Sequence, residues 1–231
     1  HVTTTIVLGG AGFDEAFLYD TSADETFTAT PQYGELTDGV YRERAEGFDK
    51  VHALATGGGA DKAYLNGSGQ EDTLIAEPSR VRLFGTGFFE RAMYFDQVYA
   101  DGLGGADTAT FSNPGPNDTF TGNPATSVMS GDGGSYWNQA DNFKKVYASA
   151  APGANNNQAV LNDSAGDDVL TLGVDAGLNW ALLANDITNP LSFFYKVTGF
   201  NQVTAKSTTG SDTRPADPLP AWLTLAGPWH T

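Results

Sequence analysis

This chain of 231 residues has no cysteine, only three histidines, and only 12 Lys and Arg. The absence of cysteine excludes disulfides, thiolate metal sites and cysteine nucleophiles. The 12 basic residues stand against 28 acidic ones, so the formal net charge is −16. That charge argues against a nucleic-acid partner, because neutralising phosphates needs clustered Lys and Arg. No apolar run approaches the ~18 residues of a membrane span, so no span is expected.

The residues that are abundant indicate an all-β fold. The 28 acidic residues are 20 Asp and 8 Glu, and the chain also has 28 Gly and 11 Pro. Asp, Gly and Pro favour turns over helix interiors, so this composition is typical of many short strands joined by tight turns. Helical spacing of apolar residues is hard to find over any window of a dozen residues.

Three landmarks recur along the chain in one order. The first has the form Phe-Asp-x-Val or a looser copy of it, and its Phe residues are spaced by 47, 48 and 57 residues: Phe48, Phe95, Phe143 and Phe200. The second is an acidic pair before Thr or Val, as in Asp24-Glu25-Thr26, and the third is a Gly-rich turn ending in Asp, as in Gly58-Gly59-Ala60-Asp61. Repetition at a fixed period predicts a repeat architecture.

Within one repeat, the apolar residues alternate over short runs, as in Val51, Ala53 and Ala55. Alternation with period two predicts strands with one face buried. We therefore predict a parallel β-solenoid (right-handed β-helix) of about four 47-residue double-coil repeats over residues 1–212. The alternative is a propeller or sandwich of antiparallel hairpins, whose Asn-Gly or Asp-Gly turns do not recur in register here. Residues 213–231, with four Pro and two Trp, are expected to form a tail or cap.

These blocks resemble the degenerate Asp/Gly-rich repeats of large extracellular and surface proteins of bacteria, planctomycete-type arrays in particular. The resemblance spans Ala11 to Asp212 and implies an adhesive or structural protein located outside the cell or on its surface. Residues 9–17 (GGAGFDEAF) are also similar to the nonapeptide of RTX solenoids, which implies calcium between successive turns.

Aspartates at the predicted turns are candidate metal ligands: Asp14, Asp24, Asp61, Asp72, Asp107, Asp118 and Asp168. In a regular stack, those at 24, 72, 118 and 168 would share one corner and those at 14, 61 and 107 another. Such stacked carboxylates would hold Ca²⁺, which takes six to eight oxygen ligands. The alternative is that each side chain accepts a backbone N–H in an Asx-turn.

The two ends of the chain are the candidate sites of self-association. Val2–Leu8 is an uncharged, β-prone strand, unlike the polar caps that usually cover solenoid ends. The C-terminal segment offers apolar residues between prolines: Leu219, Trp222, Leu223, Leu225 and Trp229. It would either fold back on its own last coil or dock on a neighbouring copy, and docking would build a head-to-tail filament. Trp137 would stack on a sugar ring or a partner if the repeated aromatic residues are exposed, or fill the core if they are not.

Catalytic motifs are absent from the sequence. A Ser-His-Asp triad would depend on His52, which occupies a slot matched by Tyr99, Tyr147 and Thr204 and is expected to be a variable surface position. The sequence therefore predicts a non-enzymatic, extracellular structural solenoid that assembles with itself. A carbohydrate-binding or adhesive module is the first alternative, and a polysaccharide lyase or hydrolase on a β-helix is the second.

Overall fold

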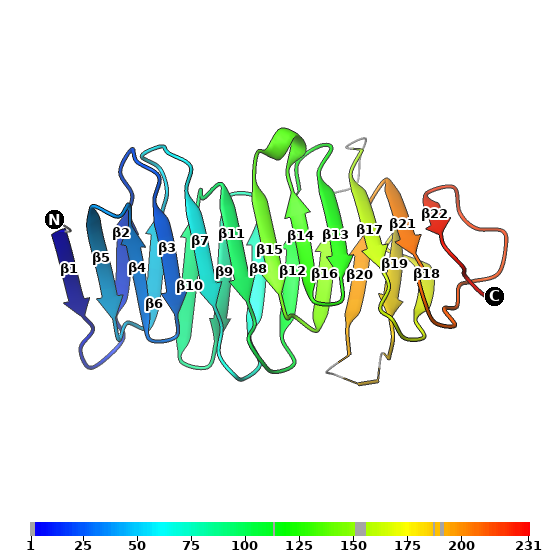
Figure 1. Cartoon of the computed structure of the whole chain (residues 1–231), viewed down its shortest axis with the longest axis horizontal. Coiled ribbons are helices and arrows are strands. Elements are labelled where there is room, and N and C mark those ends of the chain that lie inside the picture. The colour runs from blue at the N-terminus through cyan, green and yellow to red at the C-terminus, as the bar shows by residue number, and fades with distance from the viewer. Residues whose placement is uncertain (1–2, 113, 151–155, 187, 190–191) are drawn as a thin grey trace.

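The computed structural model, which describes residues 3–112, 114–150, 156–186, 188–189 and 192–231, is an elongated β-solenoid (Figure 1). Its strands form two long sheets that enclose one hydrophobic core. In spatial order, the 12-stranded sheet consists of β1 (Thr3–Leu8), β5 (Tyr41–Glu46), β4 (Tyr33–Thr37), β3 (Thr26–Thr30), β7 (Lys62–Asn66), β11 (Gln97–Asp101), β15 (Trp137–Asp141), β14 (Thr126–Ser130), β13 (Thr119–Asn123), β17 (Gln158–Asn162), β21 (Gln202–Lys206) and β22 (Leu223–Ala226).

The second sheet has ten strands and lies across the core from the first. In spatial order it consists of β2 (Glu15–Tyr19), β6 (Lys50–Leu54), β10 (Phe88–Met93), β9 (Arg80–Gly85), β8 (Thr73–Glu77), β12 (Thr108–Ser112), β16 (Lys145–Ser149), β20 (Phe194–Thr198), β19 (Leu178–Ala184) and β18 (Val169–Asp175). A single turn of 3₁₀-helix, η1 (Asp132–Gly134), precedes β15. No helix in these described ranges is long and apolar enough to cross a membrane.

The predicted solenoid is confirmed, and it contains a feature that the sequence analysis did not anticipate. In each repeat the chain makes a three-stranded antiparallel meander, and the meanders alternate between the two sheets: β3–β5, β8–β10, β13–β15 and β18–β20. The first strand of a meander pairs in parallel with the coil that follows, as β3 does with β7, and the third pairs with the coil before, as β5 does with β1. Coils therefore join to coils through parallel ladders.

The register is continuous from one end of the solenoid to the other. In the 12-stranded sheet, one row of directly paired residues runs through every strand: Ile6, Arg44, Glu35, Thr28, Tyr64, Tyr99, Gln139, Val128, Thr121, Val160, Thr204 and Thr224. The reversed strands, β4 and β14, each lie between two strands of the common direction. As a result, β1 and β22 run in the same direction at opposite ends of the sheet.

The repeated landmarks have clear packing roles. Phe95, Phe143 and Phe200 are at most 4% exposed and fill the core where the chain leaves a meander, while Phe48 is half-buried nearer the N-terminal end. The Val of each landmark is buried in the next strand, and the predicted alternation of Val51, Ala53 and Ala55 is confirmed. The interior therefore repeats because the same apolar positions recur in each unit.

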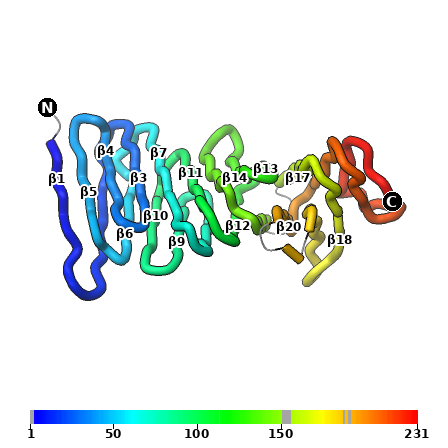
Figure 2. The backbone as a smooth tube through the Cα atoms, turned by 60° about the horizontal axis from the view of Figure 1, so that its bottom comes forward, coloured from blue at the N-terminus to red at the C-terminus, as the bar shows by residue number. Residues whose placement is uncertain are grey.

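The two ends of the solenoid are built differently (Figures 1 and 2). At the C-terminal end, β22 pairs in parallel with β21, and isolated bridges join Val169 to Thr213 and Thr213 to His230. Segment 213–231 thus adds a further coil, the first of the two arrangements expected for it. At the N-terminal end, all six residues of β1 are exposed, and β1 has one neighbouring strand, β5, within the described structure.

Candidate functional site

A ladder of side-chain to backbone hydrogen bonds runs along each edge of the solenoid, where the chain passes from one sheet to the other. The residue just before a strand, or before the bridged residue Thr213 in the last coil, accepts through its carboxylate or amide oxygen the N–H of the matching residue one coil earlier. The seven pairs, acceptor first, have donor–acceptor distances of 2.7–3.0 Å: Asp61–Glu25, Asp96–Asp61, Asn157–Asp118, Asn201–Asn157, Asp49–Asp14, Asp107–Asp72 and Asp212–Asp168. These bonds satisfy backbone donors that the sheets leave unpaired.

The predicted grouping of the aspartates into corners is wrong. Asp72 and Asp168 precede strands of the 10-stranded sheet, whereas Asp118 precedes a strand of the 12-stranded sheet, and Asp61 and Asp107 are separated in the same way. The reason is that successive meanders lie in opposite sheets, so equivalent positions fall on opposite edges. The first member of the set was also misplaced by one residue: Glu25, rather than exposed Asp24, takes the position of Asp72, Asp118 and Asp168.

All seven predicted aspartates accept at least one backbone N–H bond, but these bonds are not the expected Asx-turns, because none of the donors lies two residues after its acceptor. The pairs, donor first, are Gly10–Asp14, Ala60–Asp24, Glu25–Asp61, Ser68–Asp72, Asp72–Asp107, Gly115–Asp118, Asp132–Asp118 and Ser164–Asp168. Only two of the seven, Asp61 and Asp168, lie in the compact acidic groups found among the described residues.

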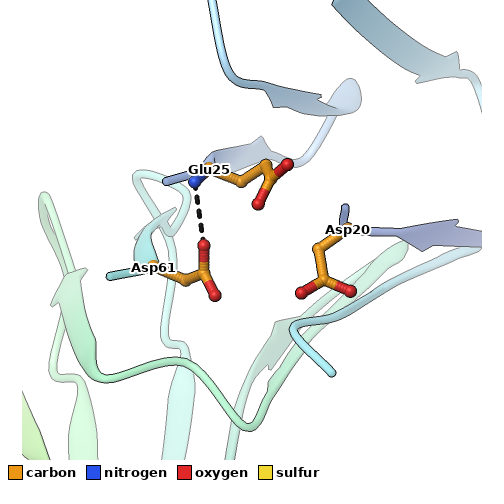
Figure 3. A group of neighbouring side chains, drawn as sticks. All are labelled: Asp20, Glu25 and Asp61. Atoms are coloured by element: carbon orange, nitrogen blue, oxygen red, sulfur yellow. Dashed lines mark hydrogen bonds between the residues drawn. The ribbon is translucent and has the colours of Figure 1, made fainter. Parts of the chain in front are cut away.

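The first acidic group, which we call the N-terminal cluster, consists of Asp20, Glu25 and Asp61 (Figure 3). One oxygen from each carboxylate lies within 4.8 Å of the others. Asp20 Oδ2 accepts the Gly57 N–H at 2.7 Å, and Asp61 Oδ1 accepts the Glu25 N–H at 2.8 Å. Glu25 is 1% exposed, and its Oε1 accepts bonds from the N–H and hydroxyl of Thr21.

The second acidic group, the C-terminal cluster, consists of Asp163, Asp168 and Asp212, all of them buried. It has the same construction, because Thr208 N–H donates to Asp163 and Asp168 N–H to Asp212, as Gly57 and Glu25 do in the N-terminal cluster. The positions of both sets are related by the repeat. Asp20, Glu25, Asp163 and Asp212 were not among the predicted ligands. The signal for Asp20 and Asp163 was an acid five residues before the second member of the acidic pair.

Burial shifts the pKa values of several acids along these edges. It raises the pKa of Asp61 to about 6, and the neighbouring charges of Glu25 and Asp20 add to the effect, while the hydrogen bond from the Glu25 N–H opposes it. Burial also raises the pKa of Asp107 to about 6 and that of Asp168 above its ordinary value. Keeping these three carboxyl groups ionised in the folded protein therefore costs free energy.

The predicted assembly residues of the C-terminal segment lie on the last coil. Leu223 is 8% exposed, and four half-buried side chains pack against the core beside it: Leu219, Trp222, Leu225 and Trp229. Trp137 is instead 39% exposed at the start of β15. The position seven residues before each landmark Phe is buried at Phe88, Tyr136 and Phe193, so most of that aromatic repeat is internal.

The N-terminal end of the solenoid is hollow. A cavity of about 310 Å³ opens between β1 and β2, and its apolar lining includes Val7, Ala16, Leu18, Ala45 and Phe48. Large apolar side chains are also exposed around this end: Ile6, Val7, Leu8, Phe13, Phe17 and Tyr19. Within the described part of the chain, no further coil covers this opening.

His52 is not the variable surface residue that the sequence analysis expected. It is 2% exposed, because Phe17 and Phe89 cover its ring and Glu15 Oε1 lies 2.6 Å from its Nε2. Alternation along β6 does direct His52 to the outer face, but aromatic residues of β2 and β10 shield it there. Burial is the largest influence on its pKa and lowers it.

Comparison with known protein families, with curated proteins and with solved structures finds no match to this chain. The class is therefore defined by the chain's own geometry: it is an acidic β-solenoid with hydrogen-bonded side-chain ladders along both edges. The resemblance to planctomycete-type surface repeats and to RTX solenoids stays a prediction.

Proposed function

We propose that this protein is an extracellular structural solenoid whose copies stack end to end into a filament. In this arrangement the N-terminal coil of one copy covers the C-terminal coil of the next. The extracellular location follows from the resemblance of the repeats to bacterial surface proteins, and the assembly follows from the two ends of the fold.

The continuous register is the observation that carries the proposal. Because β1 and β22 run in one direction and share a row of paired residues, β1 of one copy can lie beside β22 of another as β1 lies beside β5. The 12-stranded sheet would then continue across the contact in register. The contact joins unlike surfaces, so it repeats in one direction and gives a filament.

The hollow N-terminal end supports the same arrangement. An edge strand presents unpaired N–H and C=O groups that add strands readily, and β1 lacks the charges that usually protect such edges. Val7 and Leu18 line the cavity that a further coil would fill, so stacking would remove apolar surface from water. The net charge of −16 opposes association, and we therefore expect the filament to be favoured by salt.

Sedimentation velocity of the full chain at increasing concentration, at about 0.15 M and at lower ionic strength, tests the proposal. We expect concentration-dependent assembly that Val7→Lys abolishes, because it places a charge in the cavity. Leu103→Lys is the matched control, since Leu103 is similarly exposed (57% against 52% for Val7) but lies in the turn between β11 and β12, away from both ends. A chain that stays monomeric at all concentrations, or equal effects of the two variants, would contradict the proposal.

The carbohydrate-binding alternative has one observation in its favour. Tyr64 and Tyr99 stack on the outer face of the 12-stranded sheet, with ring centroids 5.3 Å apart, and Trp137 lies on the next strand. Aromatic rings on an exposed face stack on sugars. Binding on a glycan array that Trp137→Ala removes would support this function instead.

A further inference from the structure

We infer that the N-terminal cluster is a Ca²⁺ site in which Asp20, Glu25 and Asp61 supply carboxylate ligands. Within the described part of the chain, Glu25 has a buried oxygen without a hydrogen-bond donor, whereas the C-terminal cluster of the same chain has no such oxygen. The site does not depend on the proposed filament, because it lies in the interior of one copy.

The first observation concerns the second carboxylate oxygen of Glu25, Oε2. This atom is buried, and among the described residues no donor hydrogen-bonds to it. In Figure 3 the Glu25 carboxylate extends toward the space between Asp20 and Asp61. A buried carboxylate oxygen without a donor is costly unless a proton or a cation lies against it.

The C-terminal cluster shows how the same construction is completed without a cation. There, all six carboxylate oxygens accept hydrogen bonds, and three hydroxyl groups contribute: Ser164, Ser207 and Thr208. Backbone N–H groups supply the remaining bonds. Every carboxylate oxygen of this cluster is therefore hydrogen-bonded by donors of the chain itself.

The N-terminal cluster lacks two of those hydroxyls. Gly57 stands where Thr208 stands, and it donates through its backbone N–H alone. Thr56 occupies the position of Ser207 but is exposed, whereas Ser207 is buried against Asp212. A side chain at position 57 is excluded, because a Cβ there would lie 1.8 Å from the Thr21 carbonyl oxygen. The N-terminal cluster therefore has three carboxylates with fewer donors, and Glu25 Oε2 is left without one among the described residues.

The N-terminal cluster suits a metal cation as the partner of its carboxylates. The ion pairs of the described residues do not include Asp20, Glu25 or Asp61. Three carboxylates with irregular geometry suit Ca²⁺, which accepts six to eight oxygens in flexible arrangements and completes its shell with water. Mg²⁺ demands near-octahedral geometry and dehydrates reluctantly, so the site should discriminate against it. Asp20 is only half-buried and provides the entry.

Thermal unfolding of the full chain in EDTA and in millimolar CaCl₂ or MgCl₂ tests the inference. We expect Ca²⁺ to raise the Tm by about 5–10 °C at a concentration ~100-fold above its Kd, and Mg²⁺ to raise it less. Glu25→Gln should weaken Ca²⁺ binding by at least ~10-fold. Asp168→Asn, the equivalent change in the C-terminal cluster, should leave the Ca²⁺-induced shift in place.

If Glu25→Gln does not fold, Asp20→Asn serves as the second variant. Calorimetric titration of the wild-type chain and of this variant with CaCl₂ then measures Ca²⁺ binding directly. One Ca²⁺ per chain, lost in either N-terminal variant, is the expected result. Absence of binding at millimolar Ca²⁺ would overturn the inference. The inference would also be overturned if the Ca²⁺-induced rise in Tm were lost in Asp168→Asn but kept in Glu25→Gln.

Discussion

Asp107 Oδ1 accepts the backbone N–H of Asp72 at 2.7 Å, and both residues are almost completely buried. This bond crosses from one coil to the next, where strand ladders have ended and backbone donors need other partners. Asn157 and Asn201 perform the same task at equivalent positions on the opposite edge. The edge therefore requires an acceptor oxygen, and it does not require a charge.

Two substitutions of Asp107 separate those requirements. Asp107→Asn keeps an acceptor and should match or exceed the wild-type stability at pH 7–8, because above its pKa of about 6 the wild-type carboxyl is ionised and its burial costs free energy. Asp107→Ala should cost about 1–3 kcal/mol, since the Asp72 N–H loses its partner. Urea denaturation at pH 7.5 measures both. Equal losses in the two variants would show that the charge matters.

Glu90 lies in the core without hydrogen-bond partners for either carboxylate oxygen among the described residues. Burial, followed by the charge of Asp72, raises its pKa well above the ordinary 4.5. A raised pKa gives stability that is present below about pH 4.5 and is lost as the pH rises toward the folded-state value. Glu90→Leu should therefore stabilise the protein by about 1–3 kcal/mol at neutral pH, with the gain growing on the alkaline side.

Glu90→Gln is the control for that prediction. It keeps a buried polar group but cannot ionise. The part of the pH dependence of stability that comes from Glu90 should therefore disappear, and the variant should be less stable than Glu90→Leu. Urea midpoints between pH 4.5 and 9 give both quantities. An unchanged pH slope in the two variants would contradict the assigned pKa shift.

His52 should make the protein sensitive to acid. Its pKa is lowered by burial, with Arg91 and Lys50 adding to the effect and Glu15 opposing it. A depressed pKa gives stability that is present above the unfolded value of about 6.5 and is lost as the pH falls. His52→Phe, which preserves stacking on Phe17 and Phe89, should flatten the Tm profile between pH 7 and 5. Glu15→Gln should steepen it, and a His52→Phe profile that follows the wild-type profile between pH 7 and 5 would refute this assignment.

Much of the fold follows from local pattern. Alternation at positions such as Val51, Ala53 and Ala55 predicted the strands, and the recurring Phe residues predicted the repeats. The antiparallel meanders were missed because a reversed strand has the same alternation as a forward one. Their signal was the proline at the first turn of three meanders, at intervals of 47 and 46 residues: Pro31, Pro78 and Pro124.

The acidic sites were predicted in kind but not in detail. Asp residues at coil edges were expected to accept backbone N–H bonds, and they do. Which residues share a cluster depends on the sheet that each meander joins, and this choice is made by packing across the whole solenoid. For the same reason, the burial of His52 under aromatic residues from two other strands was not visible along its own strand.

Disulfide trapping between copies tests the end-to-end assembly most directly, because the chain has no cysteine of its own. Extending the register row across the contact places Ile6 of one copy beside Thr224 of the next, at a strand spacing of about 4.8 Å that a disulfide can bridge. The double variant Ile6→Cys/Thr224→Cys should oxidise to a ladder of covalent multimers, and each single variant should not. Multimers absent from the double variant, or dimers of Ile6→Cys alone, would contradict head-to-tail stacking.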